Sequence, residues 1–186
     1  ATLAEVDAHF ADLRPTAPQT PERDLSVTSI RPLSELAFSD SSTVGAKAAN
    51  VAELGRLDLA VGVVPDGFAI PFSFYDSFMR HNGFYAQARA ILEEPTFVSN
   101  TTVRQRRLKE FRGALEDGDM PDWIMIALTE MHRAFPDGRS IRLRSSTNNE
   151  DLPGFSGAGL YDSYTHHPDE GHISKSVRQV FASLWN

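Results

Sequence analysis

The chain contains no cysteine, and this absence excludes two kinds of feature at once. Without thiols the fold cannot be held by disulfide bridges, and no metal site can be built from thiolate ligands. The composition fits a reducing compartment, although it does not require one, because proteins of oxidising compartments can also lack cysteine.

Long hydrophobic runs are missing as well. No stretch approaches the roughly 18 consecutive apolar residues that are needed to cross a bilayer. The chain does not open with the basic, apolar and small-residue segments of a secretion leader. We therefore expect a soluble, cytoplasmic protein.

Basic residues are in the minority, with 18 lysines and arginines against 25 aspartates and glutamates and a formal net charge of -7. A negative chain without a basic block is poorly suited to nucleic acid or to an anionic membrane, so we expect neither partner. Any phosphate site must then be built by local geometry, because the chain as a whole offers no positive field.

What the chain does contain is the composition of a folded globular protein, with 41% hydrophobic and 10% aromatic residues. Short strand candidates lie at residues 27–30, 61–64, 68–70 and 140–146, and residues 160–165 are the expected hairpin partner of the last one. The apolar spacing predicts helices at residues 3–13, 44–57, 73–83, 84–92, 101–117 and 122–135, and from about residue 169. This mixture favours an α/β or α+β fold over a helical bundle.

Two segments divide the chain. Residues 1–26 comprise the first helix and a proline-rich arm, whereas residues 27–186 are expected to form one domain. An apolar helical stripe runs up to Trp185 at the other end. Because a large unpartnered apolar patch is unusual at a natural terminus, we expect the chain to be cut from a longer protein.

Residues 141–159 are the most informative stretch. An alternating strand ends in Arg144, Ser145 and Ser146, and a polar, acidic loop then leads to three glycines within six residues. An arginine offers a planar fork of donors that matches phosphate oxygens, and glycines let backbone N–H groups approach an anion. Core packing does not require this combination, so the sequence predicts a polyphosphate site here.

Lys47 is a second candidate phosphate ligand, because it lies beside Gly45 near the start of the helix expected at residues 44–57. The helix dipole favours an anion at this end and disfavours a lysine, so either function or accident accounts for it. The motif Gly-x-x-x-x-Gly-Lys-Ser/Thr does not occur, which excludes a P-loop nucleotide site.

Residues 154–158 come within one residue of the Gly-x-Ser-x-Gly turn of serine hydrolases. Alanine occupies the fifth position, and no buried strand leads directly into the segment. A hydrolase is therefore a weak alternative. Glu150 and Asp151 could assist a metal–nucleotide complex, but paired carboxylates of a loop are more often only solvated.

Three histidines and two carboxylates gather within residues 166–172, in a cluster rich in possible metal ligands. His166 and His167 are adjacent, however, and adjacent side chains of a strand point to opposite faces. Pro168 interrupts the segment, and Asp169 and Glu170 fit the acidic first turn of the last helix. We favour a structural role and assign no metal ligand.

These segments together resemble the N-terminal nucleotide-binding domain of the pyruvate phosphate dikinase and phosphoenolpyruvate synthase family. The resemblance covers roughly residues 27–186, with the motifs in the order and spacing of the family. No one motif is specific alone, but the set is. The matching segments are Val44-Gly45-Ala46-Lys47-Ala48-Ala49-Asn50, Val64-Pro65-Asp66-Gly67-Phe68-Ala69-Ile70, Arg144-Ser145-Ser146 with Glu150-Asp151, and Gly159-Leu160-Tyr161-Asp162-Ser163.

The resemblance implies the N-terminal part of an ATP-grasp-like nucleotide-binding domain, which is an α+β fold of helices with a small mixed or antiparallel sheet. It implies that Lys47 and Arg144 contact the phosphates of ATP and serve the catalytic step. The ATP-binding residues that it implies are Lys47, Arg144, Ser145, Ser146, Ala158, Gly159, Leu160, Tyr161, Asp162 and Ser163.

The resemblance also implies partners outside this chain. In the family, ATP phosphorylates a histidine on a separate domain, and the phosphoryl group passes to pyruvate or another acceptor. The ligands of Mg²⁺ are then expected downstream of residue 186. Because Ala46 and Ala48 stand where the family commonly has glycine, a non-catalytic nucleotide-sensing or interaction module remains the alternative.

Overall fold

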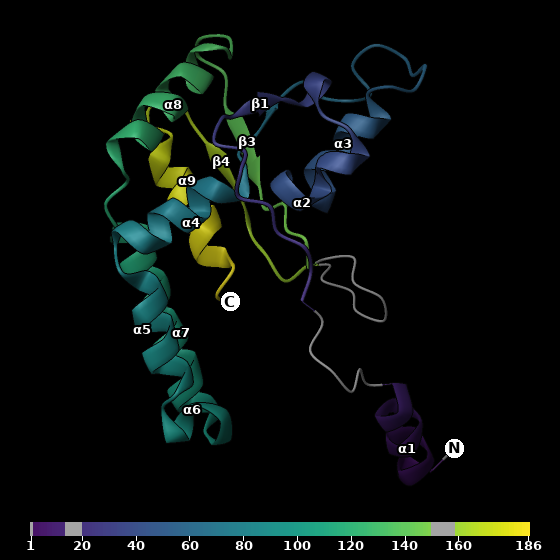
Figure 1. Ribbon diagram of the computed structural model, residues 1–186, viewed down its shortest axis with the longest axis vertical. Coiled ribbons are helices and arrows are strands. Elements are labelled where there is room, and N and C mark those ends of the chain that lie inside the picture. Colours follow the sequence, from purple (N-terminus) through teal and green to yellow (C-terminus); the bar gives the residue numbers. More distant parts are fainter. Residues whose placement is uncertain (1, 14–19, 150–158) are drawn as a thin grey trace.

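The computed structural model describes residues 2–13, 20–149 and 159–186, and these form an α+β fold (Figure 1). Its elements are α1 (Leu3–Leu13), β1 (Arg31–Pro32), η1 (Leu33–Glu35), η2 (Phe38–Asp40), α2 (Ser41–Val44), α3 (Ala46–Leu54), β2 (Phe68–Ala69), α4 (Phe72–His81), α5 (Phe84–Leu92), α6 (Pro95–Ser99), α7 (Thr101–Asp117), α8 (Asp122–Arg133), β3 (Ile141–Arg144), β4 (Ser163–His166) and α9 (Ser174–Ser183). Among the helices described, none has both the length and the apolar character that a membrane crossing requires.

The larger hydrophobic core forms where α4, α7, α8 and α9 meet β3. Phe78 of α4 is fully buried, and its ring centroid lies 5.5 Å from that of Phe84 and 5.6 Å from that of Phe181. Figure 1 shows α5, α6 and α7 lying together, and their buried residues belong to the same core. Burial of the aromatic face of α4 contributes to this core, since each large apolar side chain contributes roughly 1.5–3 kcal/mol when it leaves water.

A smaller apolar cluster joins the segments that precede α4. Leu36, Val44, Ala52 and Ala69 are all buried and come from the η1 region, α2, α3 and β2 respectively. This cluster packs α2 and α3 against the β1–β2 pair.

The described residues form two sheets, each two-stranded and antiparallel. β1 pairs with β2, with Arg31 opposite Ala69. β3 pairs with β4, with Ile141 opposite His166 and Arg144 opposite Ser163. The hairpin expected from residues 140–146 and 160–165 is therefore confirmed, with its second strand shifted by a few residues.

Several expected elements differ in the structure. The helix expected at residues 44–57 is broken at Gly45 into α2 and α3. Residues 61–64 form turns in place of a strand, with Val61 and Val63 exposed. The strand expected at residues 27–30 is found instead at residues 31–32. The last helix begins at Ser174, so Asp169 and Glu170 do not form its first turn.

Candidate functional site

The start of α3 contacts the chain just after β3, although the two are far apart in sequence. The backbone N–H of Ala46 donates to the carbonyl of Thr147 at 3.0 Å. The backbone N–H of Ala48 donates to Oγ of Ser146 at 2.9 Å, across 98 residues of chain. Gly45 is the N-cap of α3 and has no side chain to offer, so Ser146 supplies the capping oxygen from outside the helix.

Gly45 makes this approach possible. Its backbone has φ 87° and ψ 159°, a conformation that is essentially restricted to glycine. A Cβ atom at this position would lie 2.5 Å from both the carbonyl carbon and the carbonyl oxygen of Ser146. The two segments can therefore touch only because residue 45 lacks a side chain, and we call their contact the α3–β3 junction.

Two buried hydroxyl groups flank Ser146 at the α3–β3 junction. Ser145 is 3% exposed and Thr147 is 9% exposed. Neither hydroxyl has a hydrogen-bond partner within the described part of the chain. An unsatisfied buried hydroxyl costs about 1–3 kcal/mol, so a polar ligand that bonded to either hydroxyl would be stabilised there.

The two expected phosphate-binding cations belong to the segments that form the junction. Lys47 lies in the first turn of α3, between the two residues whose N–H groups bind the Ser146–Thr147 segment, and it is half-buried. Arg144 is exposed at the last position of β3, two residues before Ser146. The fold thus brings together the segments that carry Lys47, Arg144, Ser145 and Ser146.

The expected glycine loop is described only from Gly159 onward. Gly159 has φ 79°, and Leu160 is exposed. The side-chain amide of Asn186 donates to the Leu160 carbonyl at 3.4 Å and to Oδ2 of Asp162 at 3.1 Å. Tyr161 is partly exposed and Ser163 opens β4 opposite Arg144. Ala158, Glu150, Asp151 and the hydrolase-like segment at residues 154–158 lie outside the described residues.

The histidines of residues 166–172 bind separate partners. Nδ1 of His166 lies 3.1 Å from Oγ of Ser176, and Nε2 of His172 lies 2.9 Å from Oγ1 of Thr129. Within residues 2–13, 20–149 and 159–186, no group of three or more histidine or carboxylate side chains is placed to hold a metal ion. These contacts join His166 to α9 and His172 to α8.

His166 is almost fully buried, and the ring of His132 lies 5.5 Å from its own. Burial lowers the pKa of His166, and the neighbouring His132 lowers it further. Burial likewise lowers the pKa of His172, again with a contribution from His132. Both shifts favour the neutral form of these rings.

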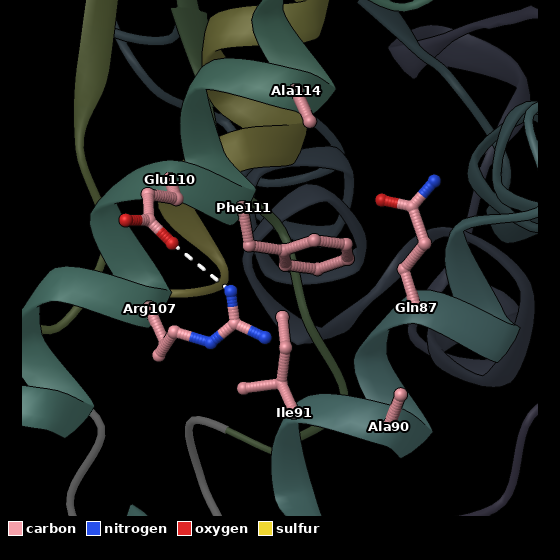
Figure 2. Close-up of a pocket in the computed structure, with 7 residues that line it drawn as sticks. All are labelled: Gln87, Ala90, Ile91, Arg107, Glu110, Phe111 and Ala114. Carbon is pink, nitrogen blue, oxygen red and sulfur yellow. Dashed lines mark hydrogen bonds and ion pairs between the residues drawn. The ribbon is translucent and has the colours of Figure 1, made fainter.

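A shallow cavity of about 250 Å³ lies elsewhere, between α5 and α7. Figure 2 shows Ile91 and Phe111 in this cavity and an ion pair between Arg107 and Glu110 beside them. Arg107 also pairs with Glu94, so its charge is already balanced. Of the expected phosphate-binding residues that the structure describes, none lines this cavity.

Sequence reasoning missed two parts of the candidate site. The first part is Thr147. It continues the run of hydroxyl side chains that begins at Ser145, and this run was the signal in the sequence that could have identified it. The role of Gly45 could not be read in the same way, because the contact that requires glycine comes from a residue about one hundred positions away.

Comparison with known proteins identifies relatives of the chain. The model of the family described as "pyruvate phosphate dikinase, AMP/ATP-binding domain" matches residues 41–186. The phosphoenolpyruvate synthase of Deinococcus radiodurans is 30% identical over 158 residues, which cover 84% of this chain and 20% of that protein. A probable phosphoenolpyruvate synthase of Methanothermobacter thermautotrophicus is 30% identical, over 81% of this chain and 22% of that protein.

A probable phosphoenolpyruvate synthase of Methanocaldococcus jannaschii is 28% identical, over 82% of this chain and 13% of that protein. The chain thus spans about a fifth or less of the length of these relatives. The family match covers most of the chain and includes both sides of the α3–β3 junction. The chain therefore belongs to the family of pyruvate phosphate dikinase AMP/ATP-binding domains.

Proposed function

We propose that this chain is the ATP-binding portion of a phosphotransferase that passes a phosphoryl group from ATP, through a phosphohistidine, to an acceptor such as pyruvate. The observation that carries the proposal is the α3–β3 junction. There, two buried hydroxyls without partners in the described chain lie beside a glycine-dependent contact at the start of a helix. The phosphoenolpyruvate synthase relatives support the phosphoryl-transfer chemistry.

The residues of the junction fit a polyphosphate. The Ser145 and Thr147 hydroxyls would donate to phosphate oxygens and so regain the hydrogen bonds that burial has removed. Lys47 would add a compact positive charge from α3. Arg144 would add a planar pair of donors from β3. Tyr161, Asp162 and Ser163 would approach from the other end of the loop, as the glycine segment of the family does.

The chemistry that ATP supplies when bound is an activated phosphoryl group. The transfer needs positioning and charge neutralisation more than covalent help from the protein. Lys47 and Arg144 would neutralise developing negative charge, and Ser145 and Thr147 would orient the phosphates. Mg²⁺ would assist, and we expect its protein ligands, like the phosphohistidine and acceptor domains, in the remainder of the full-length protein.

The proposal is tested by isothermal titration of Mg²⁺–ATP into the full-length protein and into its Arg144→Ala and Lys47→Ala variants. Loss of a charged phosphate contact should cost on the order of 1.5–3 kcal/mol, or roughly ten- to a hundredfold in affinity. The control is Arg142→Ala, because Arg142 occupies the same face of β3 two residues earlier and binds Thr165. Tight binding that neither Arg144→Ala nor Lys47→Ala weakens would contradict the proposed site.

The second candidate is a non-catalytic nucleotide-sensing or interaction module. Ala46 and Ala48, which replace glycines common in the family, favour it because they make the start of α3 stiffer. Incubation of the full-length protein with γ-labelled ATP separates the two functions. Acid-labile label on a histidine supports the phosphotransferase, whereas binding without any transfer supports the module.

A further inference from the structure

A third segment attaches to both sides of the α3–β3 junction. The side-chain amide of Asn148 donates to the backbone carbonyl of Glu22 at 2.6 Å. The backbone N–H of Asp24 donates to the carbonyl of Ser42 at 2.8 Å. Asn148 directly follows Thr147, and Ser42 belongs to α2, which ends at Gly45. Within three residues, this segment therefore holds the β3 side and the α3 side together.

The same segment is anchored to α4, whose aromatic face lies in the larger core. Oγ of Ser73 donates to the carbonyl of Val27 at 2.5 Å. Nη2 of Arg23 lies 3.6 Å from Oδ1 of Asp76. Residues 22–27, which we call the strap, thus run from a well-packed helix to the two short segments of the junction.

Asp76 is suited to be a permanent anchor. It is buried, and its carboxylate accepts hydrogen bonds from Nε of Arg80 at 2.6 Å and from the Tyr85 hydroxyl at 2.9 Å. Burial raises the pKa of Asp76, but these hydrogen bonds and the charges of Arg80 and Arg23 outweigh it and hold the pKa below its usual value. The carboxylate therefore stays charged at neutral pH and attracts Arg23.

We propose that the strap positions the phosphate site, with Arg23, Asp24 and Asn148 as positioning residues that keep the two sides of the α3–β3 junction in register. This inference rests on the proposed function, because it assigns a role toward the nucleotide that the junction binds. The strap lies outside residues 41–186, which match the family model.

The two segments that the strap joins are short and need to be held in place by contacts from outside. α2 has only four residues, and the chain after Arg144 leaves the β3–β4 pair before it reaches Ser146. Binding groups must be held within roughly 0.5 Å of their working positions to be effective. A hydrogen bond on each side restrains both segments relative to the same rigid helix.

The test uses the full-length protein with Arg23→Ala, and with Arg23→Lys as the conservative variant. Arg23 lies against α4 and not in the junction, so its substitution can affect the junction only by loosening the strap. We expect faster amide hydrogen exchange at residues 41–48 and 144–149 in Arg23→Ala, and a weakening of Mg²⁺–ATP binding by roughly two- to fivefold, as fits a half-exposed ion pair. Arg23→Lys should restore both.

A second pair of variants tests the strap directly. Asp24→Pro and Asp24→Ala both remove the side-chain oxygen that accepts from Ser26, but only the proline also removes the N–H that binds Ser42. Asp24→Pro should therefore accelerate exchange in α2 beyond Asp24→Ala. Deletion of residues 3–13 removes α1, which buries no residue, and should change neither readout.

The outcomes are distinct. Unchanged exchange at residues 41–48 and 144–149 in both Arg23→Ala and Asp24→Pro would overturn the strap proposal. Faster exchange over the whole protein would also overturn it, because it would show only general destabilisation. If the unsubstituted protein fails to bind Mg²⁺–ATP while exchange still rises locally, the proposed function is wrong and the strap still holds the junction.

Discussion

At Gly45 the backbone adopts a conformation that side chains almost never share, directly against the backbone of Ser146. Two separate penalties therefore meet at one residue. A side chain would strain the backbone, and it would also force the α3–β3 junction apart.

We expect Gly45→Ala to lower the free energy of unfolding by about 2–5 kcal/mol, as the sum of backbone strain and overpacking. Gly62→Ala is the matched control, because Gly62 has φ 85° but no atom lies within 4 Å of the position that a Cβ would take there. That variant should lose only about 1–2 kcal/mol through strain. Urea denaturation measures both, and equal losses would show that the contact with Ser146 contributes nothing.

His166 makes stability depend on pH. Its pKa is lowered by burial and by His132, so the unfolded chain binds more protons than the folded one once the pH falls below about 6.5. Glu170, whose Oε2 lies 4.0 Å from Nδ1 of His166, offsets this only in part. The protein therefore has its full stability when the pH is above the pKa of His166 in the unfolded chain. It loses stability as the pH decreases through the lower pKa of His166 in the folded protein.

We expect His166→Asn to be less stable than the unsubstituted protein at pH 7.5 but to lose less stability between roughly pH 7 and pH 5. The asparagine can still hydrogen-bond to Ser176 but cannot titrate. Thermal unfolding as a function of pH gives the slope. The same substitution at exposed His81 is the control. If stability depends on pH equally in His166→Asn and in the unsubstituted protein, His166 is not the source of the pH dependence.

Among the elements, α7 offers a paired test of packing, because it has glycine both within it and at its end. A Cβ atom on Gly118, which follows α7, would lie 2.8 Å from a ring carbon of Phe84 and 2.9 Å from one of Phe78. A Cβ atom on Gly113, in the same helix, would meet nothing within 4 Å.

Gly118→Ala should destabilise the protein by about 1–3 kcal/mol, because two buried rings would have to move. Gly113→Ala should stabilise it by about 0.5–1 kcal/mol, because alanine loses less conformational freedom in a helix. Opposite shifts of the denaturation midpoint are the expected result. A loss of stability in both variants would mean that α7 is less open around Gly113 than the structure indicates.

The sequence predicted those elements whose signals are local. Asn100 caps α7 through a 3.1 Å bond from the Val103 N–H, and Gly118 ends it, as the sequence indicates. The strand expected at residues 61–64 was wrong, because apolar side chains form a strand only where a partner strand is present. The break at Gly45 was missed for a related reason, since nothing adjacent in sequence reveals Ser146.

At the scale of the whole molecule, some features of the candidate site could be predicted from the sequence and others could not. Motifs in the sequence led us to expect phosphate binding by Lys47 and by Arg144 to Ser146, and this assignment stays a prediction. Their assembly at the start of α3, the burial of Thr147 and the attachment of residues 22–27 depend on contacts across most of the chain. Such long-range contacts leave no periodic pattern, so only the folded structure shows them.

The hydrogen bond between Ala48 and Ser146 also bears on how the protein is made. α3 has nine residues, which is too short for a helix to persist alone in water, and its cap arrives only after another 98 residues. The closing of so long a loop is entropically costly and comes late in folding. During synthesis, α3 therefore lacks its cap until the segment that follows β3 has left the ribosome.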